Sequence, residues 1–417
     1  MSSQTDLPVP FGSSSAADPY PDYALLRADG GIRRITIRPG LQPWLVTRYD
    51  DIRAVLSSEH MSNDPANTSA EVRQAIAAGR IEERVVLFGK NLLSVDPPDH
   101  TRLRRLMSRA LSARRMATME EPVTILTEQL LDALERQDQT DLLADYTLPL
   151  AIGVVCRLMG IPESDSALFC SWGRTLARTC GDDAAAFKMV SNEMAGYFRP
   201  LILTKRNRPG DDLISNLATA RNNECLDDHE LIFLIYQLFF AGYESSAYFM
   251  ATAALLLLTH PDQRAKLAAN RDLLASAIEE MLRFEGSVKV PTWRFATHPV
   301  PIGNVVIAPG EPVLTLLASG GRDEAKHNVP DQFLIDRTDT DHLAFGYGIH
   351  HCMGAALSRL ESRIAISRLF ARFPEIRLAR PVEALQWRVS LAVRGVCELP
   401  VQLGAASADR LSPADHC

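Results

Sequence analysis

Apolar residues recur at helical spacing along most of the chain, which predicts a mainly helical protein. Short stretches of alternating residues predict two hairpins, one formed by 35–37 with 44–47 and one by 305–310 with 313–317. Further short strands are expected within 375–401. The helical pattern is found in these segments: 18–30, 50–56, 70–78, 97–106, two helices within 120–159, two helices within 163–206 that break near 180–182, 232–258, 280–283 and 355–370.

The longest apolar segment, 232–258, is long enough to cross a membrane. It contains Gln237, Glu244 and a pair of serines, and neither aromatic nor basic residues flank it. An acidic residue inside a lipid-exposed helix is costly, and membrane helices usually carry such flanks. We therefore expect 232–258 to be a buried central helix of a protein that does not enter the membrane.

Length and composition indicate one large globular domain. The chain has 417 residues, of which 46% are hydrophobic and 23% charged, and no Pro/Gly/Ser-rich linker interrupts it. We expect a single domain over 18–403, with flexible segments at 1–17 and 404–417. The net charge of −7 argues against nucleic acid as a partner. Seven cysteines without paired spacing suit a reducing compartment, so we expect a cytoplasmic protein. We also expect the protein to be a monomer.

The segment from Phe345 to Gly354 carries the most specific chemistry in the chain. Three glycines bracket Cys352, and an apolar helical run follows. Glycine allows a tight loop that a bulky planar group can approach. A thiol at a helix N-terminus meets exposed N–H groups, which favour the metal-binding thiolate. Two other interpretations remain open at this point: a structural cysteine, or a zinc site formed by His350, His351 and Cys352.

The pattern Phe345-Gly346-x-Gly348-x-His350-x-Cys352-x-Gly354 resembles the haem-binding signature of the cytochrome P-450 family. The resemblance implies that Cys352 is the axial ligand of the iron of haem b, and that Phe345 and His350 belong to the same site. It also implies the family fold, a triangular, mainly α domain with small β-sheets that encloses the haem.

Other motifs follow the family's order. His100 and Arg104 lie four residues apart and share a helical face. They resemble the family's propionate-binding pair, and Arg294 resembles a further propionate contact. Ala241-Gly242-Tyr243-Glu244-Ser245 resembles the oxygen-activation motif, which implies that Glu244 and Ser245 relay protons beside Ala241. Ser245 stands where the family usually has threonine. Because serine keeps the hydroxyl, proton delivery is expected to persist.

Two further resemblances concern structure and partners. Glu280 and Arg283 resemble the family's structural Glu-x-x-Arg pair, whose usual third member is an arginine before a phenylalanine. Gln332 precedes Phe333 here, so the third member is unassigned. The arginines at 102, 105, 109, 114 and 115 could form a positive patch on which an acidic redox protein docks.

The resemblance implies a haem-dependent monooxygenase that inserts one oxygen atom from O₂ into a C–H or C=C bond of a small hydrophobic molecule. We expect a polyketide- or macrolide-type substrate in antibiotic biosynthesis, with terpenoids, steroids, fatty acids and xenobiotics as alternatives. Electrons would come from NAD(P)H through a ferredoxin reductase and a ferredoxin. A peroxygenase of the same fold and a non-enzymatic helical binding protein are the competing functions.

Overall fold

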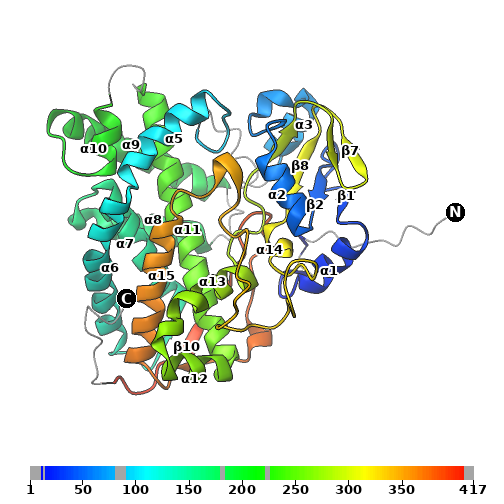
Figure 1. Ribbon diagram of the computed structural model, residues 1–417. Coiled ribbons are helices and arrows are strands. Elements are labelled where there is room, and N and C mark those ends of the chain that lie inside the picture. The colour runs from blue at the N-terminus through cyan, green and yellow to red at the C-terminus, as the bar shows by residue number, and fades with distance from the viewer. Residues whose placement is uncertain (1–10, 13–14, 80–90, 179–183, 221–225, 408–417) are drawn as a thin grey trace.

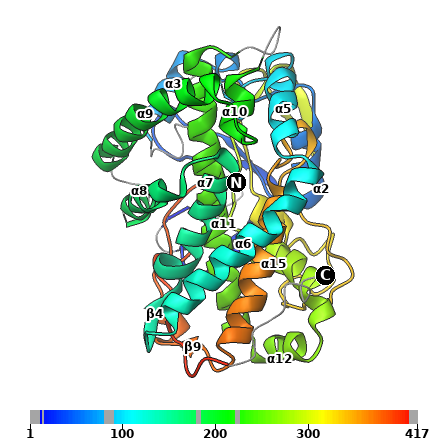
Figure 2. The same cartoon turned by 90° about the vertical axis from the view of Figure 1, so that its left-hand side faces the viewer.

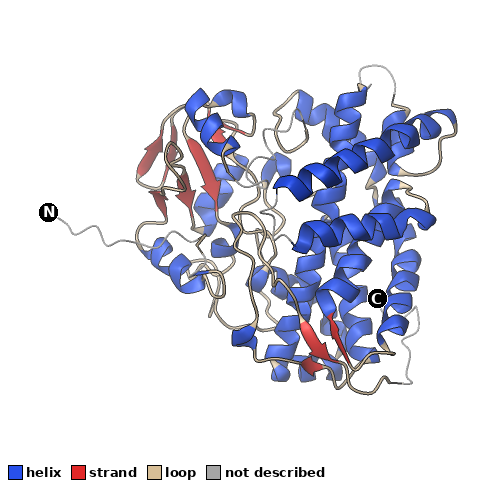
Figure 3. Cartoon of the chain, turned by 180° about the vertical axis from the view of Figure 1, so that it is seen from behind, coloured by secondary structure: helices blue, strands red, loops and turns tan. Residues whose placement is uncertain are grey.

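The computed structural model describes residues 11–12, 15–79, 91–178, 184–220 and 226–407. Helices form a large lobe on one side of the molecule, and a smaller lobe of strands with α1, α2 and α3 lies on the other (Figure 1). Figure 3 shows that the strands gather in two separate places, one in the smaller lobe and one at the edge of the helical lobe. The mainly helical fold with small sheets is therefore confirmed.

Most of the predicted helices form, within a few residues of their expected bounds. The two helices predicted within 163–206 are α8 and α9, and residues 179–183 between them lie outside the described residues. The α-helices of the described chain are α1 (Tyr20–Ala28), α2 (Tyr49–Ser57), α3 (Ala70–Ala77), α5 (Asp99–Ala110), α6 (Ala113–Leu134), α7 (Leu148–Met159), α8 (Ser166–Arg178), α9 (Ala184–Asn207), α10 (Leu213–Ala218), α11 (Asp228–Thr259), α12 (Pro261–Ala269), α13 (Leu274–Glu285), α14 (Leu317–Gly320) and α15 (Ala355–Arg372).

The strands form three sheets. The largest has the order β1-β2-β8-β5-β3, and its members are β1 (Ile32–Arg34), β2 (Trp44–Val46), β8 (Pro312–Thr315), β5 (Arg294–Ala296) and β3 (Met61–Ser62). The second has the order β4-β10-β9, with β4 (Gln139–Asp141), β10 (Pro400–Gln402) and β9 (Arg377–Leu378). The third pairs β6 (Val300–Ile302) with β7 (Val305–Ile307).

Both hairpin predictions need correction. The N-terminal hairpin forms and its second strand, β2, lies where expected, but its first strand is β1, where Ile32 pairs with Val46. Residues 35–37 follow this strand and donate backbone hydrogen bonds to Pro43 and Leu41 without being part of it. The predicted pairing of 305–310 with 313–317 is also wrong. Instead β7 turns back on β6, and β8 pairs in parallel with β2 and antiparallel with β5. All four side chains of β8 are buried, and a strand in the middle of a sheet takes partners on both sides, which local sequence does not specify.

Helix α11 is the centre of the helical lobe (Figure 2). It begins with a capping box in which Asp227 and Glu230 exchange side-chain and backbone hydrogen bonds. From Ser246 to Leu257 every residue is buried, and the helix packs against α7, α13 and α15. No helix among the described residues combines the length and the apolar character that a membrane crossing requires.

A buried ion network fixes the position of α13. Glu280 is fully buried, accepts hydrogen bonds from Arg283 Nε at 2.6 Å and Arg337 Nε at 3.2 Å, and accepts a third from the Leu334 N–H. Arg337 is therefore the third member that sequence reasoning left unassigned. The Gln332 carbonyl accepts hydrogen bonds from both arginines. Thus residue 332 joins the network through its backbone.

We expect Glu280→Gln to destabilise the protein by about 3–5 kcal/mol, because it leaves two buried arginines without their shared carboxylate. Urea unfolding of the purified protein measures this loss. Asp336→Asn is the matched control, since it breaks the half-exposed Lys266–Asp336 pair at 2.5 Å and should change stability little. Equal unfolding midpoints for the two variants would contradict the role assigned to Glu280.

Candidate active site

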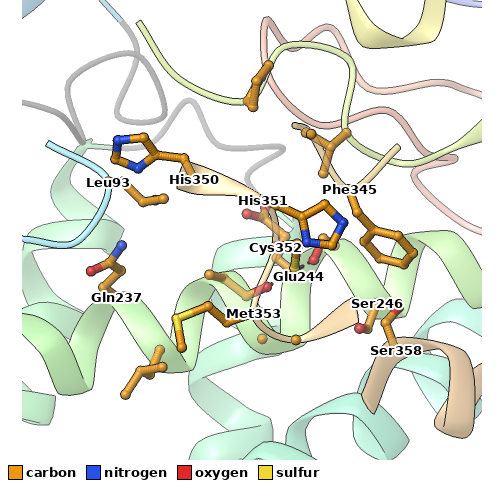
Figure 4. Close-up of a pocket in the computed structure, with 18 of the residues that line it drawn as sticks. Leu93, Gln237, Glu244, Ser246, Phe345, His350, His351, Cys352, Met353 and Ser358 are labelled. Carbon is orange, nitrogen blue, oxygen red and sulfur yellow. Dashed lines mark hydrogen bonds between the residues drawn. The ribbon is translucent and has the colours of Figure 1, made fainter. Parts of the chain in front are cut away.

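A cavity of about 350 Å³ lies between α11 and the loop before α15. Figure 4 labels Cys352 and Phe345 from this loop and Glu244 and Ser246 from α11 among the residues that line the cavity. Val288 and Val290 contribute apolar side chains to the cavity wall, as do Ala392 and Val393 from the C-terminal part of the chain. Every site residue named from the sequence except His100 lines this cavity, namely Arg104, Ala241, Glu244, Ser245, Arg294, Phe345, His350 and Cys352.

The backbone of the loop determines where the Cys352 sulfur lies. The Cys352 N–H donates to the Phe345 carbonyl at 2.9 Å, which closes the loop. Gly348 has φ +73° and packs so closely that a Cβ there would lie 2.3 Å from the Leu56 carbonyl oxygen. Only glycine satisfies both requirements. The glycine spacing thus turns the sulfur into the cavity, two residues before Gly354 caps α15.

Opposing influences act on the Cys352 thiol. As expected from its place before a helix, the N–H groups of Gly354 and Ala355 and the charges of Arg104 and Arg359 lower its pKa. Burial has the larger effect and raises the pKa of the thiol above its ordinary value of 9.0 in the metal-free protein. A coordinated metal ion would reverse this balance, because its charge deprotonates a ligating thiol.

Positively charged and imidazole side chains gather at one edge of the cavity. Arg294 is 3% exposed, and burial lowers its pKa to about 10. The rings of His100 and His350 lie 4.3 Å apart, and burial beside arginines lowers the pKa of His350 to about 2. Arg294 Nε and His100 Nε2 are buried without a hydrogen-bond partner among the described residues.

These unsatisfied buried donors are what an anion-bearing group would satisfy. A planar haem with two propionates fits the arrangement, because the cysteine sulfur and the cationic edge face the same cavity. Arg104 lies beside both, where its Nη2 donates to the His351 carbonyl at 2.8 Å. The Phe345 ring packs under the Arg359 guanidinium at 4.6 Å. The residues present therefore fit haem.

Zinc does not fit the same residues. The His350 ring turns toward His100 and away from Cys352 (Figure 4). In the described part of the chain, no three His, Cys, Asp or Glu side chains converge as metal ligands. The adjacent His350, His351 and Cys352 thus do not form a tetrahedral set.

Glu244 and Ser245, the two residues of the expected proton relay on α11, already have partners. The Ser245 hydroxyl donates to the Ala241 carbonyl at 2.9 Å, and the Ser245 carbonyl accepts from the Ser287 hydroxyl at 2.8 Å. Glu244 pairs with Arg388 at 2.8 Å. The Ser245 hydroxyl and the Glu244 carboxylate are therefore not hydrogen-bonded to each other, although both residues line the cavity.

Sequence reasoning missed Glu361, a second acid at the cavity. It lies on α15, is 2% exposed and hydrogen-bonds to Ser246 of α11. Burial raises its pKa to about 8, so at neutral pH it is mostly the neutral acid. A signal was present: Glu361 falls four residues after Leu357 and four before Ala365, on the apolar face of its helix.

We expect this acid to make stability depend on pH. Between its ordinary pKa of 4.5 and about 8, folded Glu361 keeps a proton that the unfolded chain releases. Folding stability therefore falls as pH rises through that window, at up to roughly 1.4 kcal/mol per pH unit. Glu361→Gln is neutral at every pH and should gain stability over wild type from pH 5 to pH 8, as measured by urea unfolding.

The exposed Glu383 provides the control. Glu383→Gln should keep the pH dependence of the wild type. A Glu361→Gln curve parallel to the wild-type curve would mean that Glu361 is already ionised at neutral pH.

Comparison with known proteins agrees with the geometry. The family described as Cytochrome P450 matches residues 184–376. The chain is 38% identical to Cytochrome P450 107B1 of Saccharopolyspora erythraea over 95% of this chain and 97% of that protein. It is 39% identical to the monooxygenase PikC of Streptomyces venezuelae over 94% of this chain and 92% of that protein.

Solved structures show the same relationship. The myxobacterial cytochrome P450 CYP267B1, in complex with myristic acid, superposes with a TM-score of 0.85 at 34% identity, over 94% of this chain and 98% of that one. Fold, cysteine loop and full-length similarity agree, and the chain belongs to the cytochrome P450 family.

Proposed function

We propose that the protein is a haem-thiolate monooxygenase that inserts one atom of O₂ into a C–H or C=C bond of a polyketide- or macrolide-type molecule in antibiotic biosynthesis. The observation that carries the proposal is that Cys352 and residues of α11 line the same, largely apolar cavity. Relatives named for such substrates support the substrate class. They include the mycinamicin IV hydroxylase/epoxidase of Micromonospora griseorubida, 35% identical, and the 6-deoxyerythronolide B hydroxylase of Saccharopolyspora erythraea, 34% identical.

Haem b would be held by the sulfur of Cys352 and, through its propionates, by Arg294, His100, Arg104 and His350. When bound, thiolate-ligated haem supplies the activation of O₂, because the sulfur donates electron density that favours O–O cleavage. The overall reaction is RH + O₂ + NAD(P)H + H⁺ → ROH + H₂O + NAD(P)⁺. The protein must therefore bring protons to the cavity and keep the substrate in place.

Residues of α11 bring protons to the cavity. The small side chain of Ala241 leaves space beside the helix, and Glu244 and Ser245 flank that space. The Glu244 carboxylate can take a proton from water and pass it to the Ser245 hydroxyl, whose own proton can then leave from Oγ once that hydroxyl turns away from the Ala241 carbonyl. Ser246 and the neutral Glu361 provide a second hydrogen-bonded acid at the same wall.

Apolar residues keep the substrate in place. Leu92, Leu93, Leu238, Val290 and Val393 line the cavity. Such a wall binds by removing apolar surface from water, which suits a large hydrophobic molecule with few charges. Terpenoids, steroids and fatty acids meet the same requirement, and the names of the relatives favour polyketides among them.

Electrons would reach the haem from NAD(P)H through a ferredoxin reductase and a ferredoxin. Of the arginines expected to form a docking patch, Arg102 pairs with Glu230 at 2.6 Å and Arg115 pairs with Asp211. Arg105 is exposed, and the side chains at 109 and 114 lie outside the described residues. Glu244 and Ser245 stand where a peroxygenase of this fold typically has Arg-Pro, which favours the monooxygenase.

We expect Cys352→Ala to abolish the far-shifted Soret band that thiolate haem shows after reduction and addition of carbon monoxide. Cys170→Ala removes a thiol on α8 and should keep the band. The measurement is an absorption difference spectrum of each purified protein. A colourless wild-type protein would exclude the haem enzyme and favour the binding-protein alternative.

We expect Ser245→Ala to divert NADPH into hydrogen peroxide, since the last hydroxyl of the proposed relay is lost. The measurement is peroxide formed per NADPH consumed, with a surrogate ferredoxin and reductase and a macrolactone that shifts the spin state of the iron. Ser245→Thr restores the hydroxyl and should restore coupling. An unchanged peroxide fraction in Ser245→Ala would exclude Ser245 from the relay.

A further inference from the structure

Gln237 is a polar residue in an apolar part of the cavity wall. It lies on α11 one helical turn before Ala241, and Figure 4 labels it among the residues that line the cavity. Leu234 and Leu238 of the same helix line the cavity on either side of it in the sequence, as does Leu92, which contacts it. An amide in such surroundings needs hydrogen-bond partners, because an unpaired polar group is costly once water is excluded.

One hydrogen bond fixes which end of the Gln237 amide is free. The Leu92 N–H donates to Gln237 Oε1 at 3.0 Å. Because an N–H requires an acceptor, the oxygen is the end that faces Leu92, and the Nε2 amino group is the opposite end. Nε2 donates to no residue in the described part of the chain. Gln237 therefore offers the cavity a hydrogen-bond donor.

The segment that orients Gln237 is itself held in place. Leu93 lines the cavity beside Leu92, and its carbonyl accepts from Asn63 Nδ2 at 2.9 Å. Asn63 is fully buried, and its Nδ2 also donates to the Thr292 hydroxyl at 3.1 Å. The donor on Gln237 is thus oriented in advance, so a ligand that meets it avoids most of the entropy cost of ordering the side chain.

Serine hydroxyls that line the same cavity already have partners. The Ser245 hydroxyl donates to a backbone carbonyl of α11, and the Ser287 hydroxyl donates to the Ser245 carbonyl. Ser246 is hydrogen-bonded to Glu361. Gln237 differs from these three residues, because no acceptor within the described ranges takes up its amino group. A molecule bound in the cavity can supply that acceptor.

We infer that Gln237 determines substrate specificity by donating a hydrogen bond from Nε2 to a ketone or lactone carbonyl of the bound molecule. The apolar surroundings disfavour a charged oxygen at this point. The inference rests on the proposed function and narrows its substrate class. Gln237 lies four residues before Ala241, which is about 6 Å along the helix axis. The carbonyl therefore lies about one helical turn from the carbon that is oxidised beside Ala241.

The test compares cyclopentadecanone with cyclopentadecane, two rings that differ only in one carbonyl group. Each ring is titrated into the haem-loaded protein, and the change in the spin state of the iron gives its Kd. The ratio of the two Kd values isolates the carbonyl, because both rings share the same apolar contacts. Gln237→Leu removes both hydrogen-bonding ends of the amide. Gln237→Glu, titrated at pH 8, keeps an acceptor for the Leu92 N–H and removes the donor.

We expect the ratio of the cyclopentadecane Kd to the cyclopentadecanone Kd to fall about tenfold in Gln237→Leu. The reason is that the ketone loses its donor, and the hydrocarbon no longer leaves a donor unpaired. Gln237→Glu should lower the ratio at least as far, because the ketone oxygen then meets a second acceptor.

Leu238→Ala is the control, since it removes apolar contact with both rings from the neighbouring position of α11. Both Kd values should rise while their ratio stays at the wild-type value. Equal ratios in wild type and Gln237→Leu overturn the inference. A wild-type protein that has the thiolate-haem band but binds neither ring overturns it as well.

The carbonyl stretch of bound cyclopentadecanone is a readout that depends on neither spin state nor turnover. With ¹³C at the carbonyl, the infrared band should lie at lower wavenumber in wild type than in Gln237→Leu, because hydrogen bonding weakens the C=O bond. A band at the same position in both proteins means that Gln237 only holds the Leu92 segment, which overturns the inference. Failure of the proposed function looks different, because the wild-type protein would then lack the thiolate-haem band.

Discussion

The hydrogen bond from the Cys352 N–H to the Phe345 carbonyl is the constraint on which the site depends. It closes a loop that Gly348 lets pack against α2, and it directs one sulfur into the cavity. Every other group acts relative to that sulfur: the cationic edge sets the orientation of a planar ligand, and α11 bounds the space opposite. The Glu280 network supports the same arrangement from behind, since α13 packs against both α11 and α15.

Buried charge is used in two different ways. Around Glu280 each charge has a partner, and the result is rigidity. At the cavity, by contrast, Arg294 and His100 keep buried donors without partners among the described residues, and Glu361 is held neutral. Unsatisfied groups of this kind cost stability unless a ligand pairs with them. Because Arg294 lines the cavity and the His100 ring adjoins His350, a ligand in the cavity can reach these groups.

Local pattern was enough to predict the helices and the cysteine loop, because both are specified by residues close in sequence. The glycine spacing before Cys352 indicated a tight loop, and the part of the apolar segment at 246–257 is buried in α11 as expected. Pairings between distant segments were not predictable in this way. β8 took β2 and β5 as neighbours instead of its sequence neighbour, and Arg337 reached Glu280 from an unexpected position. The opposing effect of burial on the thiol pKa was not predictable, because desolvation depends on packing that the sequence does not display.

The site is assembled from widely separated parts of the chain. His100 comes from the first quarter of the sequence, α11 from the middle, and Cys352 and Arg388 from the last fifth. A growing polypeptide on the ribosome therefore has Arg104 and Arg294 before it has the sulfur of Cys352. Capture of the cofactor must be a late event in the life of the molecule, after translation has nearly ended. Until then Arg294 Nε, which is buried without a hydrogen-bond partner among the described residues, lacks the anionic group that would satisfy it.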